Sequence, residues 1–460
     1  MREFNKTYFW LLLLASGLIF IINQSYFGCL SIAGIWLLNI AGESVFFARA
    51  NGLLNFLGLA LAVVFYIPFL APTADFFGTQ TRTENILLIS GVVVIFLLFW
   101  AWFLRRLQKF SSVWSHMIVF SVILLLLLLS LILHIDPLAI FALRLFVCLC
   151  LRNLWYFMFA IIDSRGQMRP LNILEVITPF WNLSAVPFTI EPREKSHTRI
   201  RLIYSGIFLL ISSILIGIAL DLVKGAEDSN VLVAAISSYK MRPDLITSKD
   251  GYFNYYRSDL LSFADTWTIC IGGFLFHLFG MIMKTNFWIG VARLCGFPVL
   301  RYIYIPFKSR TFYQVLSRTN YFYVQMITKV LMNPLIVSMT WIKSARIRIS
   351  FAVFCSVFSV GMVYHFLKFP HIIFKVEILQ YLQMYLGYSF YFFLIALTAS
   401  LSVIWTLARP PAPEGVWRNR IRNSIYFIVY AAILSAIGDD FLWIPGQDHN
   451  FFFFRLLHLH

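Results

Sequence analysis

The stretch "SFAVFCSVFSVGMVYHFLKF", residues 350–369, is apolar over the length that a bilayer requires. A hydrocarbon core is about 30 Å thick, and about 20 apolar residues cross it as an α-helix. Its strongly polar side chains are His365 and Lys368, both near the end of the stretch. These residues therefore predict a membrane-spanning helix that carries a histidine.

Stretches of this kind recur along all 460 residues of the chain. The composition is 60% hydrophobic and 13% charged, whereas soluble domains average about 25% charged residues. We therefore predict an all-α polytopic membrane protein with about 11 transmembrane helices. The predicted spans are 8–24, 28–47, 53–73, 86–103, 117–135, 137–162, 202–222, 266–283, 350–369, 378–406 and 423–444.

The chain is predicted to form a single integral membrane domain over residues 1–460, because neither an internal repeat nor a long polar linker is visible. Its largest outward segment, 224–265, mixes charges of both signs with aromatic residues. An amphipathic lid over the membrane domain and an ordered surface loop explain this composition equally well.

The net charge of +16 comes from basic residues that are divided among short loops. A nucleic-acid-binding protein would instead gather them on one exposed face. If the N-terminus is cytoplasmic, most lysines and arginines fall on the cytoplasmic side, in agreement with the positive-inside rule. We therefore expect a cytoplasmic N-terminus and no nucleic-acid partner.

The region 285–342 contains two apolar pieces, 287–307 and 321–342, on either side of the basic linker "KSRTFYQVLSRTN" (308–320). If both pieces crossed the membrane, this linker would lie outside, against the charge bias. We therefore predict re-entrant or tilted helices that enter from the cytoplasmic face, where enclosed backbone is tolerated. The residues expected to break these helices are Gly296, Pro298, Pro306 and Pro334.

From Thr266 to Val376 the sequence has twelve lysines and arginines but neither Asp nor Glu. Carboxylate catalysis and carboxylate metal sites are excluded there, and the six cysteines show no zinc-ligand spacing, so no metal site is predicted. A proton acceptor in this region would be His277, His365 or His371. The cations suit an anionic ligand such as a phosphate, and anchoring of cytoplasmic helix ends explains them equally well.

His365 is the strongest candidate among these histidines. An ionisable residue inside a membrane helix indicates a functional site by default, although an interfacial histidine bound to a backbone carbonyl is the ordinary alternative. Burial favours the neutral imidazole, which can accept a proton. At 1.5 Å per residue, His365 lies about 22 Å along the helix from Ser350, roughly two-thirds of the way across a ~30 Å core.

The order of motifs over residues 290–370 resembles that of the membrane-bound O-acyltransferase (MBOAT) family. The segment "GFPVLRYIYIPFKSRTFYQVLSRTNYFYVQ" is followed further along by "FSVGMVYHFL". In the family, a Gly-Phe pair and a proline followed by an aromatic precede the pattern F-W-x-R-[WY]-[HN], and an invariant histidine follows on a later apolar helix. Leu316 and Thr319 depart from this pattern, since Trp and an aromatic are usual there. The matching residues are Gly296, Phe297, Pro306, Phe307, Arg318, Asn320 and His365.

The resemblance implies an enzyme that transfers an acyl group from a thioester to a hydroxyl. His365 would be the catalytic base, and Asn320 would bind the carbonyl or orient the acceptor. The donor would be acyl-CoA or an acyl carrier protein thioester, with no bound cofactor, and a short acyl group such as acetyl is expected. Residues expected to contact the substrates are Arg318, Arg310, Lys308, Lys329 and Tyr364.

The resemblance also implies a setting for the reaction. It predicts a protein of the bacterial cytoplasmic (inner) membrane, surrounded by membrane lipids, with an envelope glycan or lipid as the acceptor. Many members of the family depend on an extracytoplasmic or carrier partner protein, so such a partner is expected here as well.

Two other functions stay open at the level of sequence. A transporter or flippase could use the cationic region to move anionic lipid-linked substrates or polysaccharides, but transporters usually show internal repeats. A membrane glycosyltransferase usually has a carboxylate in an early outward loop. The first such loop, 24–27, has none, whereas a later loop holds Asp75 and Glu84.

Overall fold

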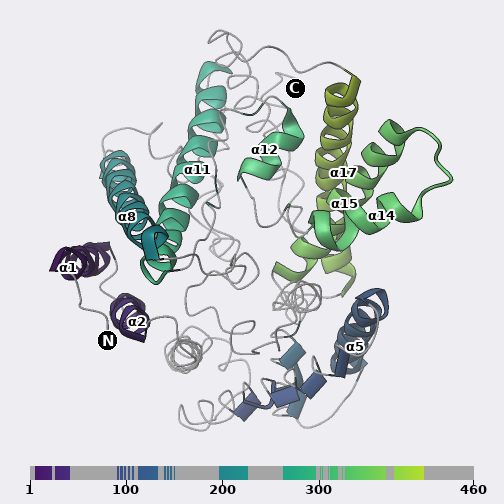
Figure 1. Ribbon diagram of the computed structural model, residues 1–460. Helices are drawn as coiled ribbons and strands as arrows, with labels where there is room; N and C mark the ends of the chain where they lie inside the picture. The colour runs from purple at the N-terminus through teal and green to yellow at the C-terminus, as the bar shows by residue number, and fades with distance from the viewer. Residues whose placement is uncertain are drawn as a thin grey trace. The chain divides into compact units, whose positions relative to one another are not determined.

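The computed structural model is helical wherever it describes regular structure (Figure 1). No strand occurs among the described residues. The predicted spans 53–73 and 423–444 lie outside the described residues, as does nearly all of the outward segment 224–265. The structure describes residues 6–22, 26–41, 112–132, 196–225, 263–296, 311–319, 327–368 and 378–408, with isolated positions within 91–107, 139–150 and 301–324.

Among the described residues, four helices are long and apolar enough to cross a membrane, and each overlaps a predicted span. They are α8 (Ser196–Gly225), α11 (Phe263–Leu294), α15 (Ala345–Lys368) and α17 (Ile378–Ala408). Three further apolar helices lie at predicted spans, α1 (Lys6–Ile22), α2 (Tyr26–Ala41) and α5 (Ser112–Ile132). The described positions within the predicted spans 86–103 and 137–162 are also helical.

Large apolar side chains are exposed along these helices. Leu215 of α8 is 62% exposed and Trp405 of α17 is 58% exposed. Soluble proteins rarely expose extended apolar surface, whereas a lipid-facing helix presents such side chains to the acyl chains. Together with the length of the four helices, this exposure indicates a membrane protein that is helical in the part of the chain that the structure describes.

The chain divides into two compact units, Met1–Ile211 with Phe287–Leu300, and Ser212–Asn286 with Arg301–His460. Helices α8 and α11 each contribute residues to both units. A single membrane domain over residues 1–460 therefore stays a prediction.

In the first unit, α1 packs against α2, and Asn39 of α2 binds the end of α11. The Asn39 side-chain amide donates to the carbonyl oxygens of Leu294 at 2.9 Å and Ile35 at 2.7 Å. Leu294 is the last residue of α11, and carbonyls at a helix C-terminus have no partner within the helix. Asn39 therefore caps α11 from a neighbouring helix.

Helix α11 is longer than the predicted span 266–283, because it continues without interruption to Leu294. The helix therefore includes the beginning of the predicted apolar piece 287–307. Lys284 lies within this helix and is exposed. The expected break at Gly296 is confirmed, since Gly296 has a φ of 91°, in the left-handed region that favours glycine.

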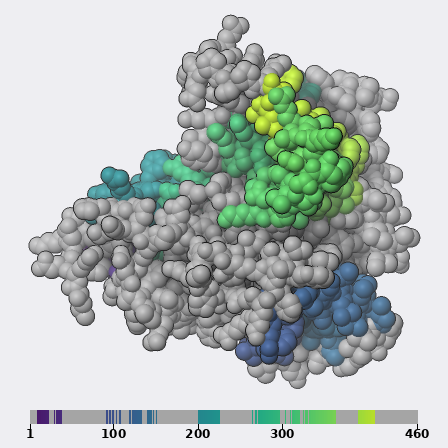
Figure 2. Space-filling model, turned by 45° about the vertical axis from the view of Figure 1, so that its right-hand side comes forward, coloured from purple at the N-terminus to yellow at the C-terminus, as the bar shows by residue number. Residues whose placement is uncertain are grey.

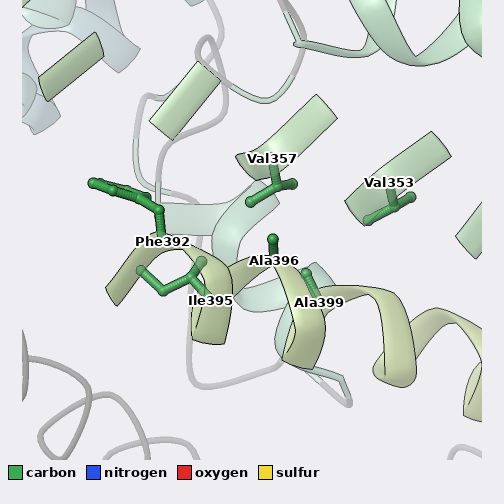
Figure 3. Close-up of a cluster of buried hydrophobic side chains, with 6 residues drawn as sticks. All are labelled: Val353, Val357, Phe392, Ile395, Ala396 and Ala399. Carbon is green, nitrogen blue, oxygen red and sulfur yellow. The ribbon is translucent and has the colours of Figure 1, made fainter. Parts of the chain in front are cut away.

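The second unit contains an antiparallel pair of helices, α15 and α17 (Figure 1). The Ser400 hydroxyl donates to the Ser350 carbonyl at 2.9 Å, and Gly361 faces the ring of Phe392. The contact later along α15, at Gly361, is made by the residue earlier along α17, Phe392, so the two helices run in opposite directions. Figure 3 shows the buried side chains between them, which are Val353, Val357, Phe392, Ile395, Ala396 and Ala399.

Between the basic linker and α15 the chain forms a short π-helix, η6 (Thr328–Met332), that leads into α14 (Asn333–Ser338). Pro334 does not break the helix, so this prediction was wrong. A proline lacks an N–H group and clashes with the carbonyl four residues earlier. The π-helix changes that register, since Asn333 N–H bonds to the Thr328 carbonyl five residues back. Pro334 then lies in the first turn of α14, where no N–H donor is needed.

Helical backbone ends at Met339 instead, where φ is −89° and ψ is 41°. Pro298 and Pro306 lie outside the described residues. Whether the helices of 285–342 enter the membrane from one face stays a prediction.

Substitution of Gly361 by alanine is expected to lower stability. An added Cβ would overlap Cδ1 of the buried Phe392 ring, and overpacking of this kind costs about 1–3 kcal/mol. Thermal unfolding of the purified protein in detergent measures the effect. Gly280→Ala in α11 is the control, because its Cβ would meet nothing within 4 Å, and a gain of up to ~1 kcal/mol is expected there. Equal stability of Gly361→Ala and wild type would contradict the close approach of α15 and α17.

Candidate functional site

The helix α15 carries His365 and runs unbroken from Ala345 to Lys368. The regular rise that places His365 about 22 Å from Ser350 therefore applies along the whole interval. Position 365 follows Gly361 by four residues, so both positions lie on the same face of α15. This is the face on which Gly361 meets Phe392 of α17.

Position 365 lies beyond the Gly361–Phe392 contact, toward the N-terminal half of α17, because the two helices are antiparallel. Tyr364 is the neighbouring position on α15. For Tyr364 and His365 the structure describes the helix alone, and their roles in catalysis and substrate binding stay predictions.

Arg318 lies near the end of α12 (Phe312–Thr319), a short helix in the segment that the sequence presents as a basic linker. The Thr311 hydroxyl accepts a hydrogen bond from Gln314 N–H at 3.2 Å. A threonine followed three residues later by a glutamine is a capping pattern that starts a helix. This pattern predicts the start of α12 from the sequence, whereas the positive charge of the segment carries no information about a helix.

Helix α12 is bound to the α15–α17 pair through its apolar side. Phe312, Tyr313 and Leu316 pack against the buried cluster between the two helices. Tyr313 N–H donates to the Ser402 hydroxyl of α17 at 3.1 Å, and the Tyr313 hydroxyl lies 3.8 Å from the Met332 sulfur. Leu316, which departs from the family pattern, thus occupies a partly buried apolar position.

The first turn of α12 is anchored near the C-terminal end of α17 and away from position 365. Ser402 is ten residues beyond Phe392 on the same helix, which corresponds to about 15 Å along the axis. Figure 1 shows α12 beside this part of α17. The described part of the basic segment and α15 thus belong to one compact unit. The start of α12 and position 365 lie at different heights along the axis of the α15–α17 pair.

Lys329 lies in the π-helix η6 and is exposed. This element contacts α15, and Met332 of η6 packs against the buried cluster. Short π-helices occur frequently at functional sites. This statistical association makes η6 a candidate part of a site. Contact of Lys329 with a substrate stays a prediction.

Asn320, Lys308 and Arg310 lie outside the described residues. The distance between Asn320 and His365, on which a shared site depends, therefore stays a prediction. Of the other histidines, His277 is half-buried on α11, and His371 is outside the described residues.

No three His, Cys, Asp or Glu side chains come together as a metal site would require, within the part of the chain that the structure describes. Helices α12, α14, α15 and α17 also contain no carboxylate. Acid–base chemistry on these helices would therefore depend on histidine, tyrosine, cysteine or lysine. That the reaction needs no metal stays a prediction.

Comparison with known proteins adds no further assignment, since no family model and no curated protein matches the chain. The likeness to acyltransferases thus rests on the motif order and on the continuous helix that carries His365.

Ser402→Ala is expected to loosen α12. It removes the acceptor of the Tyr313 N–H bond, and a net hydrogen bond is worth about 1 kcal/mol, or roughly fivefold in local opening. Hydrogen exchange of a peptide covering Phe312–Thr319 should rise by that factor. Thr406→Ala is the matched control, because the Thr406 hydroxyl is exposed and donates to the Ser402 carbonyl of its own helix. Exchange that is the same in Ser402→Ala and wild type would show that this bond does not hold α12.

Proposed function

We propose that the protein is a membrane-embedded O-acyltransferase that resembles the MBOAT family. It moves a short acyl group, acetyl in the simplest case, from a cytoplasmic thioester to a hydroxyl of an envelope glycan or lipid. The observation that carries the proposal is His365 on α15, an apolar helix of spanning length in a region without carboxylates.

His365 acts as the general base in this proposal. The neutral imidazole takes the proton of the acceptor hydroxyl while the hydroxyl oxygen attacks the thioester carbonyl. The carbon–sulfur bond then breaks, and the imidazolium returns the proton to the leaving thiolate. The products are an ester and a free thiol, and no oxidant or reductant is required.

Asn320 stabilises the carbonyl oxygen of the tetrahedral intermediate or orients the acceptor. A single well-placed donor in a water-poor site lowers the barrier by a few kcal/mol. Asn320 follows directly after α12 in the sequence, and α12 belongs to the same compact unit as α15. A common site for Asn320 and His365 is part of the proposal.

The donor binds with its phosphates at the basic segment. Arg318 on α12 and Lys329 on η6 belong to this segment, together with Lys308 and Arg310. Cations bind phosphates through charge-assisted hydrogen bonds. The pantetheine arm of coenzyme A or an acyl carrier protein is long and thin, so it can extend from the segment around α12 toward His365.

The proposal places the protein in a bacterial cytoplasmic membrane with its N-terminus inside. Thioesters are made in the cytoplasm and envelope acceptors lie outside, so a base deep in the bilayer is reachable from both sides. Trapping or delivery of the acceptor by an extracytoplasmic partner protein belongs to the same proposal.

The second candidate is a transporter or flippase for anionic lipid-linked or polysaccharide substrates. The excess of cations over residues 266–376 favours it. A transporter moves its substrate without covalent change, so the appearance of a labelled ester separates the two. For a membrane glycosyltransferase, the candidate carboxylates Asp75 and Glu84 lie outside the described residues.

Membranes that contain the protein should transfer label from acetyl-CoA to envelope material. His365→Ala is expected to lower the rate by about 10²–10⁴-fold, as loss of a general base does. Asn320→Ala is expected to lower it by about 10²-fold, as loss of one oxyanion donor does. Thin-layer or glycan analysis of the labelled product at matched expression measures both effects.

His277→Ala serves as the histidine control for this experiment, since His277 lies on α11 outside the motif region, and its rate should equal that of wild type. Undiminished transfer in a folded His365→Ala protein would rule out this histidine as the base. Equal rates of acetyl transfer by the His277→Ala and His365→Ala proteins would likewise rule out His365 as the base.

A further inference from the structure

The corner between α14 and α15, residues 333–348, lies where a membrane helix begins. Helix α15 begins at Ala345 and its predicted membrane span begins at Ser350, and the residues just before a span lie at the level of the lipid headgroups. Helix α14 packs against α15. In Figure 2 the bright-green atoms of this part of the chain are uncovered on the face turned toward the viewer.

Three cations lie at this corner. Lys343 and Arg346 are exposed, and Arg348 is half-buried. The Arg348 Nε is enclosed and has no hydrogen-bond partner among the described residues. An enclosed cationic donor without a partner is costly, and a negative charge beside the half-buried guanidinium would offset part of that cost.

The protein supplies no negative charge to balance these cations from the described elements that pack against α15. Neither α14, η6 nor α17 contains Asp or Glu. The first turn of α15 also lacks an acidic residue, and the N-terminus of a helix itself carries partial positive charge. Arg346 and Arg348 therefore add to a positive potential that favours an anion.

The same corner exposes large apolar side chains. Trp341 is 74% exposed and Val337 is 73% exposed, and Ile347 and Phe351 are exposed one turn apart on α15. Tryptophan is enriched at the membrane–water interface, where its ring lies among headgroups. A soluble anion would contact only the cations, whereas a phospholipid offers a phosphate and an acyl chain to one surface.

We propose that this corner binds an anionic phospholipid. The Arg348 guanidinium donates hydrogen bonds to the lipid phosphate, since its planar donors match a phosphate in two-point contact. Lys343 and Arg346 contribute charge at the rim, and the acyl chain lies against Val337 and Trp341. The bound lipid fixes the depth at which α15 enters the bilayer, whatever reaction the protein performs.

The test measures lipid binding by the purified full-length protein in a non-ionic detergent. Native mass spectrometry follows the titration with phosphatidylglycerol and yields an apparent Kd. Each cation near a membrane surface contributes about fivefold to anionic lipid affinity. Arg348→Gln should therefore weaken binding by at least about fivefold, and the triple variant with Lys343→Gln and Arg346→Gln by about a hundredfold.

Lys224→Gln is the charge-matched control, because Lys224 is an exposed cation in the last turn of α8, and its Kd should equal that of wild type. Phosphatidylcholine should bind more weakly than phosphatidylglycerol, and millimolar glycerol 3-phosphate should not compete. If Arg348→Gln does not fold, Arg348→Lys and the Lys343→Gln/Arg346→Gln pair provide the same comparison.

Equal phosphatidylglycerol affinity of wild type and the corner variants would overturn the proposal and favour an acidic protein segment as the occupant. Equal binding of phosphatidylcholine and phosphatidylglycerol would also overturn it, because binding would then not depend on the net charge of the lipid. Displacement of the lipid by glycerol 3-phosphate would overturn it as well, because the site would then bind free phosphate compounds.

Discussion

The close packing of α15 against α17 is the constraint on which the second unit depends. Gly361 leaves room for the Phe392 ring, and a buried cluster of valine, isoleucine and alanine side chains continues this contact toward Ser350. Because α12 and η6 pack onto the same cluster, the position of the basic segment follows from this pair. The helix that carries His365 is thus also the helix that orders the elements around the motif region.

Two groups of cations lie in the second unit, one at the start of α15 and one on α12 and η6, and we propose a different anionic ligand for each. Helices α12, η6 and the start of α15 carry cations without any acidic neighbour on the described elements. At the start of α15 the cations adjoin exposed apolar side chains, which suits a resident lipid. Arg318 of α12 belongs to the motif region, and Lys329 of η6 follows it in the sequence, where the proposed donor would bind its phosphates. The proposed lipid and the proposed donor therefore differ in the apolar surface beside each cation.

Hydropathy predicted the four described helices of spanning length, because twenty consecutive apolar residues have few alternatives in a bilayer. Helix ends depend on backbone detail that hydropathy does not contain. Helix α11 continues past the predicted span 266–283, and Pro334 does not end its helix, because a π-helical turn accommodates it. The contacts of Tyr313 with Ser402 and of Asn39 with Leu294 join residues far apart in the sequence. No local pattern predicts them, whereas the Thr311–Gln314 cap was readable.

Chemical rescue is the decisive measurement for an imidazole at position 365 that accepts a proton within the membrane. Added imidazole should restore acetyl transfer to the inactive His365→Ala protein in a concentration-dependent way and leave Asn320→Ala unrescued. Transfer by His365→Ala at the wild-type rate, with or without imidazole, would instead assign His365 a structural role.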